Sequence, residues 1–167
     1  MDICKYGEEV LKTHSKKIKN IDDQIVQLVE QMRFTMYQAN GIGLAAPQVG
    51  QSIQLAIVDI TLGENQNEFM VLINPEIIES QGSESSEEGC LSIPGVTVPV
   101  DRHTYIKIRA YDLQGREIEK EYRDHRARVI QHELDHLNGV LIIDHLSSLK
   151  KQLVKKEIKK LKSNGQW

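Results

Sequence analysis

The residue types and spacing of a hydrolytic metal site occur at His132-Glu133-Leu134-Asp135-His136. On an α-helix, four residues turn the chain by about 400°, so the two histidines project from one face about one turn apart. This separation suits two ligands on one metal ion, and Glu133 is placed to take a proton from a metal-bound water molecule. The pattern predicts a metal-dependent hydrolase, but two histidines do not complete a metal site.

The residues alone leave the third metal ligand open. One class of zinc protease has a third histidine six residues after the second, where this chain has Ile142, and His145 comes three residues too late. Another class takes a glutamate from a later helix, which here would be Glu157, although an ion pair would also account for that residue. Cys90 is the remaining candidate, because a turn bounded by glycine and proline can present its thiolate. A cysteine with two histidines gives three protein ligands and an open position for water, but free cysteine is also common as a small buried residue.

The motif must be carried by a helix, and the sequence predicts one at 124–138 that ends at Gly139. Apolar residues recur in it at helical spacing, so one face of this helix belongs in the core. The same spacing predicts an N-terminal helix that begins at Asp22 or Asp23 and ends near Asn40, and a lysine-rich C-terminal helix at 147–162.

Short strands are predicted between the first two helices. Segment 41–50 is predicted to be a tight loop of small residues, and segment 83–88 a polar, acidic approach to the cysteine. Because short antiparallel strands precede the metal helix, the pattern indicates an α+β fold, with antiparallel β-sheets packed around a central metal-binding helix and with an N-terminal and a C-terminal helix. The predicted strands are 53–60, 69–74, 76–79, 104–112 and 116–122, the last two joined by a turn at Gln114-Gly115.

The composition is that of an ordinary globular protein. The chain has 167 residues, of which 40% are hydrophobic and 27% charged, so we expect one domain over residues 1–167. The net charge of −3 gives no general attraction to nucleic acid, and no apolar run is long enough to span a membrane, so neither DNA nor a membrane is an expected partner. Residues 1–5 lack the apolar core of a signal peptide, and two cysteines make no disulfide framework. We therefore expect a cytoplasmic location, with an organelle as the alternative.

Three segments together resemble the peptide deformylase family: GIGLAAPQVG at 41–50, EGCLSIP at 88–94 and QHELDHLNG at 131–139. They occur in the order of the family and at similar separations. The trailing VLIIDHLSSLKKQ and the helix that follows are similar to the long-helix form found in bacteria and organelles. The resemblance covers nearly the whole chain, and it implies a hydrolase that removes the N-formyl group from the formylmethionine of newly made polypeptides and releases formate.

The resemblance implies a role for each matching residue. Cys90 would complete the metal site, Glu133 would act as general base and then as acid, and the Gln48 side chain and the Leu91 backbone N–H would hold the developing oxyanion. The metal would be one divalent ion, Fe(II) in the cell and also Zn, Ni or Co in purified protein, because a thiolate with two imidazoles accepts all of them. The other assigned residues are Ile42, Gly43, Leu44, Gly89, His125, Arg128 and Val129 for substrate binding, and the ion pair of Glu88 with Arg102 for structural support.

Some positions depart from the family pattern. The residues before the metal motif line the methionine pocket in the family, and here they include His125 and Arg128. The aliphatic part of Arg128 is expected to line the pocket while its charged head reaches water. Ser86 and Thr97 are also unexpected at their positions. These changes predict a methionine pocket with a more polar rim, whereas a solvated His125 is the simpler alternative.

Two other functions remain open on the sequence. The first is an H-E-x-x-H zinc endopeptidase that uses Glu157 as its third ligand. The second is an inactive family member that binds ribosomes, since the lysines of the last helix would suit a transient contact with ribosomal RNA. A solvated helix face accounts for the same lysines. We expect a monomer that acts on N-formylmethionyl nascent peptides.

Overall fold

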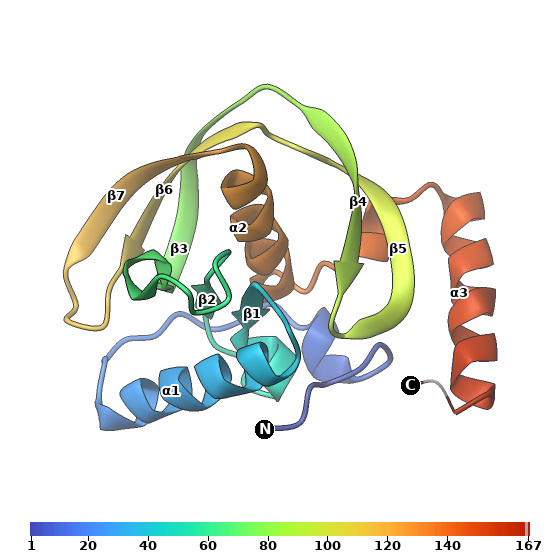
Figure 1. The fold of residues 1–167 in the computed structure, drawn as a ribbon, viewed down its shortest axis with the longest axis horizontal. Helices are drawn as coiled ribbons and strands as arrows, with labels where there is room; N and C mark the ends of the chain where they lie inside the picture. Colours follow the sequence, from blue (N-terminus) through green and yellow to red (C-terminus); the bar gives the residue numbers. More distant parts are fainter. Residues whose placement is uncertain (166) are drawn as a thin grey trace.

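The structure, a computed structural model, describes residues 1–165 and Trp167. It combines α-helices with antiparallel sheets, as the sequence predicts (Figure 1). Among the helices that the structure describes, none is both long enough and apolar enough to cross a membrane. The helices are α1 (Asp23–Gln38), α2 (Asp124–Leu137) and α3 (Ser148–Ser163), and the strands are β1 (Gly43–Ala45), β2 (Leu55–Val58), β3 (Met70–Gln81), β4 (Glu84–Cys90), β5 (Ile93–Arg102), β6 (Tyr105–Tyr111) and β7 (Glu117–Arg123).

Two sheets enclose the motif helix. Five strands form one antiparallel sheet in the order β1-β2-β3-β6-β7, and β4 and β5 form a separate hairpin. Figure 1 shows α2 between the five-stranded sheet and the β4–β5 hairpin, with α3 on the outer side of β5. This arrangement brings the end of β4 to one face of the motif helix.

The motif helix α2 is held by an apolar face and a glycine stop. Val129, Ile130 and Leu134 are buried against β2, β3 and β6, which confirms the predicted core face. The helix ends before Gly139, which has a φ of +71°. A Cβ at this position would lie 2.6 Å from the backbone oxygen of Lys12, so only glycine lets the chain turn so close to the N-terminal segment.

Helix α1 begins where the sequence predicts. The side chain of Asp22 caps it by accepting hydrogen bonds from the backbone N–H groups of Gln24 and Ile25, each at 3.1 Å. Its buried face, which includes Met32 and Met36, packs on the core beside β1 and β2. The helix therefore supports the short strand that follows it.

The structure corrects three strand predictions. Segment 41–50 is not only a loop, because Gly43–Ala45 pairs with β2 and a 3-10 turn follows at Ala46–Val49. Segment 83–88 is not an irregular approach, because it forms most of β4 and pairs with β5. The strands predicted at 69–74 and 76–79 are one strand, β3, with a register shift at Pro75.

Strand β5 was absent from the sequence prediction. Its two prolines, Pro94 and Pro99, cannot donate to a ladder and are unfavourable in a strand. The strand nevertheless alternates, with Val96, Val98 and Val100 buried against the 3-10 turn at Ile142–His145 and α3. A two-stranded hairpin leaves one edge of β5 without a ladder partner in its sheet, which makes room for proline.

Candidate active site

Three metal-ligating side chains converge beside α2. Cys90, at the end of β4, has its Sγ 3.3 Å from Nε2 of His136, and the Nε2 atoms of His132 and His136 are 3.2 Å apart. All three donor atoms lie within 4.8 Å of one another. A tetrahedral ion with ordinary bond lengths to nitrogen and sulfur separates its ligands by about 3.3–3.6 Å. The spacing therefore fits a single metal ion with a thiolate and two imidazoles.

The surroundings of Cys90 favour the thiolate. Burial alone would raise the pKa of its thiol, but the adjacent His136 and His132 bring that pKa well below its usual value. The thiolate is the form that binds a metal. The donor chemistry of the site thus agrees with its geometry.

Glu88 fixes the orientation of His132. Its carboxylate accepts a hydrogen bond from Nδ1 of His132 at 2.9 Å, which leaves Nε2 of that ring free toward Cys90. Arg102 donates to the same carboxylate from Nε at 2.9 Å and from Nη2 at 3.0 Å. Burial would raise the pKa of Glu88, but the hydrogen bonds from His132 and Arg102 keep it well below its usual value. A charged carboxylate therefore lies behind the metal site.

The ion pair extends to the protein surface. Arg102 also donates from Nη1 to Asp135 at 2.6 Å, and Nε2 of His145 lies 2.7 Å from the same carboxylate oxygen. His145 is thus not a metal ligand in this arrangement but an outer partner of Asp135. Ile142 lies in the core under β5, so the protease that uses a histidine at this position is excluded.

The head of Arg128 does not reach into water as the sequence suggested. Its Nη1 donates to Glu88 at 2.9 Å and to the backbone oxygen of Val100 at 2.8 Å, and its Nη2 donates to the backbone oxygen of Glu84 at 2.6 Å. The reason is the β4–β5 hairpin, which the sequence did not predict and which supplies these acceptors. Arg128 therefore ties α2 to the hairpin as well as lining the cleft.

Glu133 is a buried carboxyl beside the donor cluster. Its side chain is almost inaccessible, and burial raises its pKa to about 7. A Cβ placed on Gly43 would lie 2.3 Å from Oε1 of Glu133, so this carboxyl packs directly on the backbone of β1. Within the described residues, its Oε2 has no hydrogen-bond partner. A carboxyl with these properties can exchange a proton with a bound molecule near neutral pH.

Gln48 is held at both ends of its amide. Its Oε1 accepts a hydrogen bond from the backbone N–H of Ala45 at 2.9 Å, and its Nε2 lies 3.2 Å from Oγ of Ser92 and 3.7 Å from Sγ of Cys90. Leu91 follows Cys90 in the turn between β4 and β5. Gln48 and Leu91 thus lie on the two segments that flank the donor cluster.

One cleft has a volume of about 640 Å³ and is lined by Gln48, Cys90, Leu91, His132 and Glu133. The substrate-contact residues that the sequence suggested lie on its wall, except Leu44, whose side chain is fully buried under α1. Only the backbone of Leu44 is left to contact a substrate. Sequence reasoning missed other residues of the wall, which carry no motif: Ile3, Lys5, Asn40, Glu87 and Gly95.

Glu157 does not approach the metal donors. It is exposed on α3, which packs on β5 and on the 3-10 turn before it. Figure 1 shows the β4–β5 hairpin between α3 and α2. The endopeptidase that would use Glu157 as third ligand therefore has no support in the fold.

Comparisons with known proteins place nearly the whole chain in one family. The family model for polypeptide deformylases matches residues 1–152. A peptide deformylase of Desulfotalea psychrophila is 46% identical over 161 residues, which cover 96% of this chain and 95% of that one. A crystal structure of a peptide deformylase from Legionella pneumophila superposes with a TM-score of 0.92 at 37% identity, covering 98% of this chain and 96% of that one. A peptide deformylase from Synechococcus elongatus in complex with actinonin gives a TM-score of 0.88 at 41% identity, with coverages of 99% and 88%. The chain belongs to the polypeptide deformylase family.

Proposed function

We propose that Cys90, His132 and His136 hold one divalent metal ion, with which the chain hydrolyses the N-formyl group of formylmethionyl nascent peptides. The convergence of the cysteine with both motif histidines carries this proposal. When bound there, the ion supplies a Lewis acid that lowers the pKa of a water molecule toward neutrality. We take Fe(II) as the ion in the cell and Zn, Ni or Co as substitutes that the same donors accept.

Glu133 is the proposed proton carrier. Its carboxylate takes a proton from the attacking water and later gives it to the nitrogen of the leaving amine. Its burial and its raised pKa, about 7, support this double role, because both protonation states are accessible near neutral pH. The products are formate and a peptide with a free amino group on methionine.

Gln48 and Leu91 are the proposed oxyanion donors. Nε2 of Gln48 and the backbone N–H of Leu91 would bind the formyl oxygen as its negative charge grows. The contacts of Gln48 with Ala45 and Ser92 support this role, because a side chain that is already held loses little freedom when the charge develops. One such donor is worth about 3 kcal/mol in comparable enzymes.

The peptide would bind as an added strand. β1 is an edge strand of its sheet, and Gly43 on β1 and Gly89 on β4 line the same cleft. An extended peptide can pair its backbone with such an edge, while its methionine side chain enters a pocket.

His125, which is exposed, and Ser86 line this cleft and would give the pocket a polar rim. If the rim contributes, His125→Leu should change the ratio of kcat/KM values for formyl-Met and formyl-norleucine peptides, and an unchanged ratio would refute this point.

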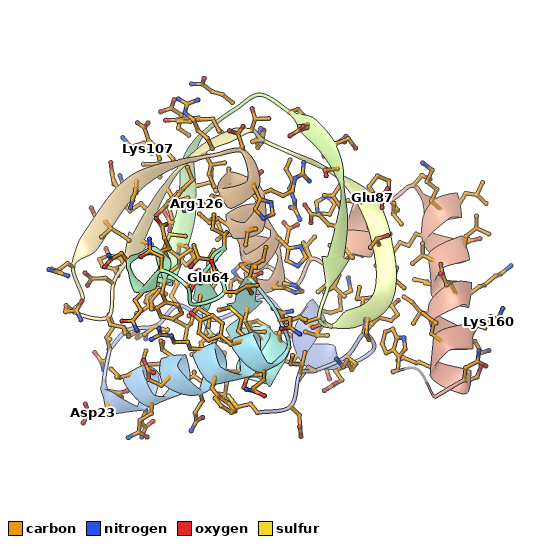
Figure 2. The ribbon with its side chains drawn as sticks, viewed as in Figure 1. Asp23, Glu64, Glu87, Lys107, Arg126 and Lys160 are labelled. Carbon is orange, nitrogen blue, oxygen red and sulfur yellow. The ribbon has the colours of Figure 1, made fainter. Side chains whose placement is uncertain are left out.

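We also propose that residues 1–167 act as one catalytic domain and as a monomer in the cytoplasm. Cys4 and Cys90 are not joined in a disulfide. Figure 2 shows Lys160 on the side of α3 that faces away from the rest of the chain. This exposed basic helix would allow a transient contact with ribosomal RNA, and co-sedimentation with ribosomes before and after added salt would test it.

Formate release and metal content together test the proposed function. The wild-type protein should release formate from formyl-Met-Ala-Ser without cutting any peptide bond. Cys90→Ala should lose both the bound metal and the activity, whereas Glu133→Gln should keep the metal and lose activity by about 10²–10⁴-fold. Retained metal and activity in Cys90→Ala would refute the assignment of the third ligand, and a cleaved peptide bond would favour an endopeptidase.

A further inference from the structure

The N-terminal segment 3–6 is attached to both elements that carry the proposed oxyanion donors. The backbone N–H of Cys4 donates to the backbone oxygen of Gln48 at 2.8 Å, and that of Tyr6 donates to the backbone oxygen of Ser92 at 2.9 Å. These contacts join the first residues of the chain to the 3-10 turn after β1 and to the turn between β4 and β5. The segment therefore connects two parts of the site that lie far apart in the sequence.

Lys5 adds a side-chain contact between these two backbone bonds. Its ammonium nitrogen donates to the backbone oxygen of Leu91 at 2.9 Å, across 86 positions of sequence. Lys5 is partly buried and lines the same cleft as Gln48 and Glu133. Holding a lysine side chain in one place costs conformational entropy, so the contact must be favourable enough to offset this loss.

The turn that Lys5 contacts is the tip of the β4–β5 hairpin, where Leu91 packs on the core cluster beside α1 and Ser92 is buried. In the β4–β5 ladder, Cys90 pairs with Ile93, so Leu91 and Ser92 are the two residues at the tip of the hairpin. Their carbonyl oxygens are held by Lys5 and by Tyr6. Holding these two carbonyls fixes the peptide planes that follow Leu91 and Ser92. The Leu91 N–H lies in the preceding plane, which joins the first of these at the Cα of Leu91, so the Lys5 contact restricts the direction of this N–H through a single Cα. A misplacement of a catalytic donor by about 1 Å can cost about 10²-fold in rate.

We propose that Lys5 is a positioning residue, which holds the Leu91 carbonyl and thereby fixes the direction in which the Leu91 N–H meets the developing oxyanion. This inference rests on the proposed function of the site. The ammonium group also places a fixed positive charge on the wall of the cleft in which negative charge develops. Both effects stabilise the transition state rather than the bound peptide, so their loss should lower kcat and leave KM nearly unchanged.

The far side of the segment is also anchored. Nζ of Lys162, near the end of α3, donates to the backbone oxygen of Tyr6 at 2.6 Å and lies 4.5 Å from the centre of the Trp167 ring. The C-terminal helix thus holds the segment that carries Lys5. Substitution of Lys5 leaves these contacts and the backbone bonds of Cys4 and Tyr6 in place, so the segment should stay docked.

The test compares Lys5→Met and Lys5→Arg with Lys19→Met, which removes an exposed lysine in the segment before α1. Each protein is assayed for kcat and KM with formyl-Met-Ala-Ser, for bound metal, for Tm, and for the backbone amide resonance of Leu91 in leucine-labelled protein. We expect Lys5→Met to lower kcat about tenfold, as outer partners of catalytic groups do, with unchanged metal content. KM should change less than about twofold, and the Leu91 resonance should shift. Lys5→Arg should restore most of kcat, and Lys19→Met should match the wild type.

Four results would overturn the proposal: a wild-type kcat in Lys5→Met, a change confined to KM, an equal loss of kcat in Lys5→Arg, or a loss of metal that accounts for the loss of rate. If Lys5→Met does not fold, the resonance and kcat of Lys5→Arg decide, because that variant keeps a donor. A wild-type protein that releases no formate would refute the proposed function instead, while the shift of the Leu91 resonance would still report whether Lys5 holds the turn.

Discussion

The Glu88→Gln substitution tests the support behind the metal site. The Glu88 carboxylate is 7% exposed and accepts four hydrogen bonds, two from Arg102 and one each from Arg128 and His132. A glutamine amide has the same shape but one acceptor oxygen, and its NH₂ group would face donors. The change therefore removes the negative charge and leaves buried N–H groups without acceptors.

The expected loss follows from these contacts. Breaking a buried ion pair by removing one partner costs about 3–5 kcal/mol. Arg102 keeps Asp135 as a partner at 2.6 Å, so we expect the lower end of this range, about 3 kcal/mol. In a chain of this size, that corresponds to a decrease in Tm of roughly 6–12 °C. The loosened His132 ring should also lower the metal affinity by about 10–100-fold.

Two measurements on the same protein check this prediction. Urea denaturation gives the free energy of unfolding of the metal-free chain, and competition with a chromophoric chelator gives the metal affinity. Glu87→Gln is the matched control, because Glu87 is the exposed neighbour on β4 and the substitution removes the same charge. A metal affinity within about threefold of wild type, together with a loss of stability under about 1 kcal/mol, would refute the supporting role of Glu88.

Three further predictions concern the carboxyls and the metal. Gly43→Ala should lower kcat at least about tenfold while the metal stays bound, because the new Cβ would lie 2.3 Å from Oε1 of Glu133. Asp144→Asn should cost about 0.5–1 kcal/mol at pH 7. Burial opposes ionisation of Asp144, but hydrogen bonds from Lys12 and Lys151 lower its pKa to about 2. Its contribution to the free energy of unfolding is therefore complete above about pH 4 and is lost as the pH falls toward 2. Removal of the metal by a chelator should abolish formate release and lower the free energy of unfolding, by about 4 kcal/mol relative to metal at a thousand times its Kd.

Each of these predictions has its own check. Metal content and Tm separate a displaced carboxyl in Gly43→Ala from a damaged fold, and a wild-type kcat would contradict the packing. Urea denaturation from pH 7 to pH 3 follows Asp144→Asn, and a difference from wild type that widens below pH 4 would contradict the sign. Returning a divalent metal to the stripped protein should restore activity, and full activity in the presence of excess chelator would refute metal dependence.

Local pattern was sufficient for the helices and for part of the site. The apolar spacing at 124–138 and the glycine at 139 locate α2, because burial of one helix face and a left-handed stop are both encoded within a few residues. The capping aspartate of α1 is equally local. No strand is predicted from the sequence at β5, in which Pro94 and Pro99 are locally unfavourable and only pairing with β4 and packing on α3 compensate for them.

Three residues in or near the cleft are likewise placed by contacts between distant parts of the chain, which local pattern does not predict. Lys5 has no motif around it, and nothing in its neighbourhood predicts a contact 86 positions away. The head of Arg128 was expected in water, because its acceptors at Glu84 and Val100 appear only when the hairpin closes over α2. Leu44 was expected in the cleft, but the alternation of β1 turns its side chain into the core.

The sequence by itself determined the chemistry of the donors: two histidines one helical turn apart, a glutamate between them and a thiol in a turn that could present it. It also determined the family, through three motifs in order. Only the tertiary structure brought Cys90 beside the two histidines, since Cys90 and His136 are 46 positions apart and their distance of 3.3 Å depends on how the β4–β5 hairpin docks on α2. The physical reason is that helical periodicity fixes distances over a few residues, whereas distances between elements are set by burial and pairing over the whole chain.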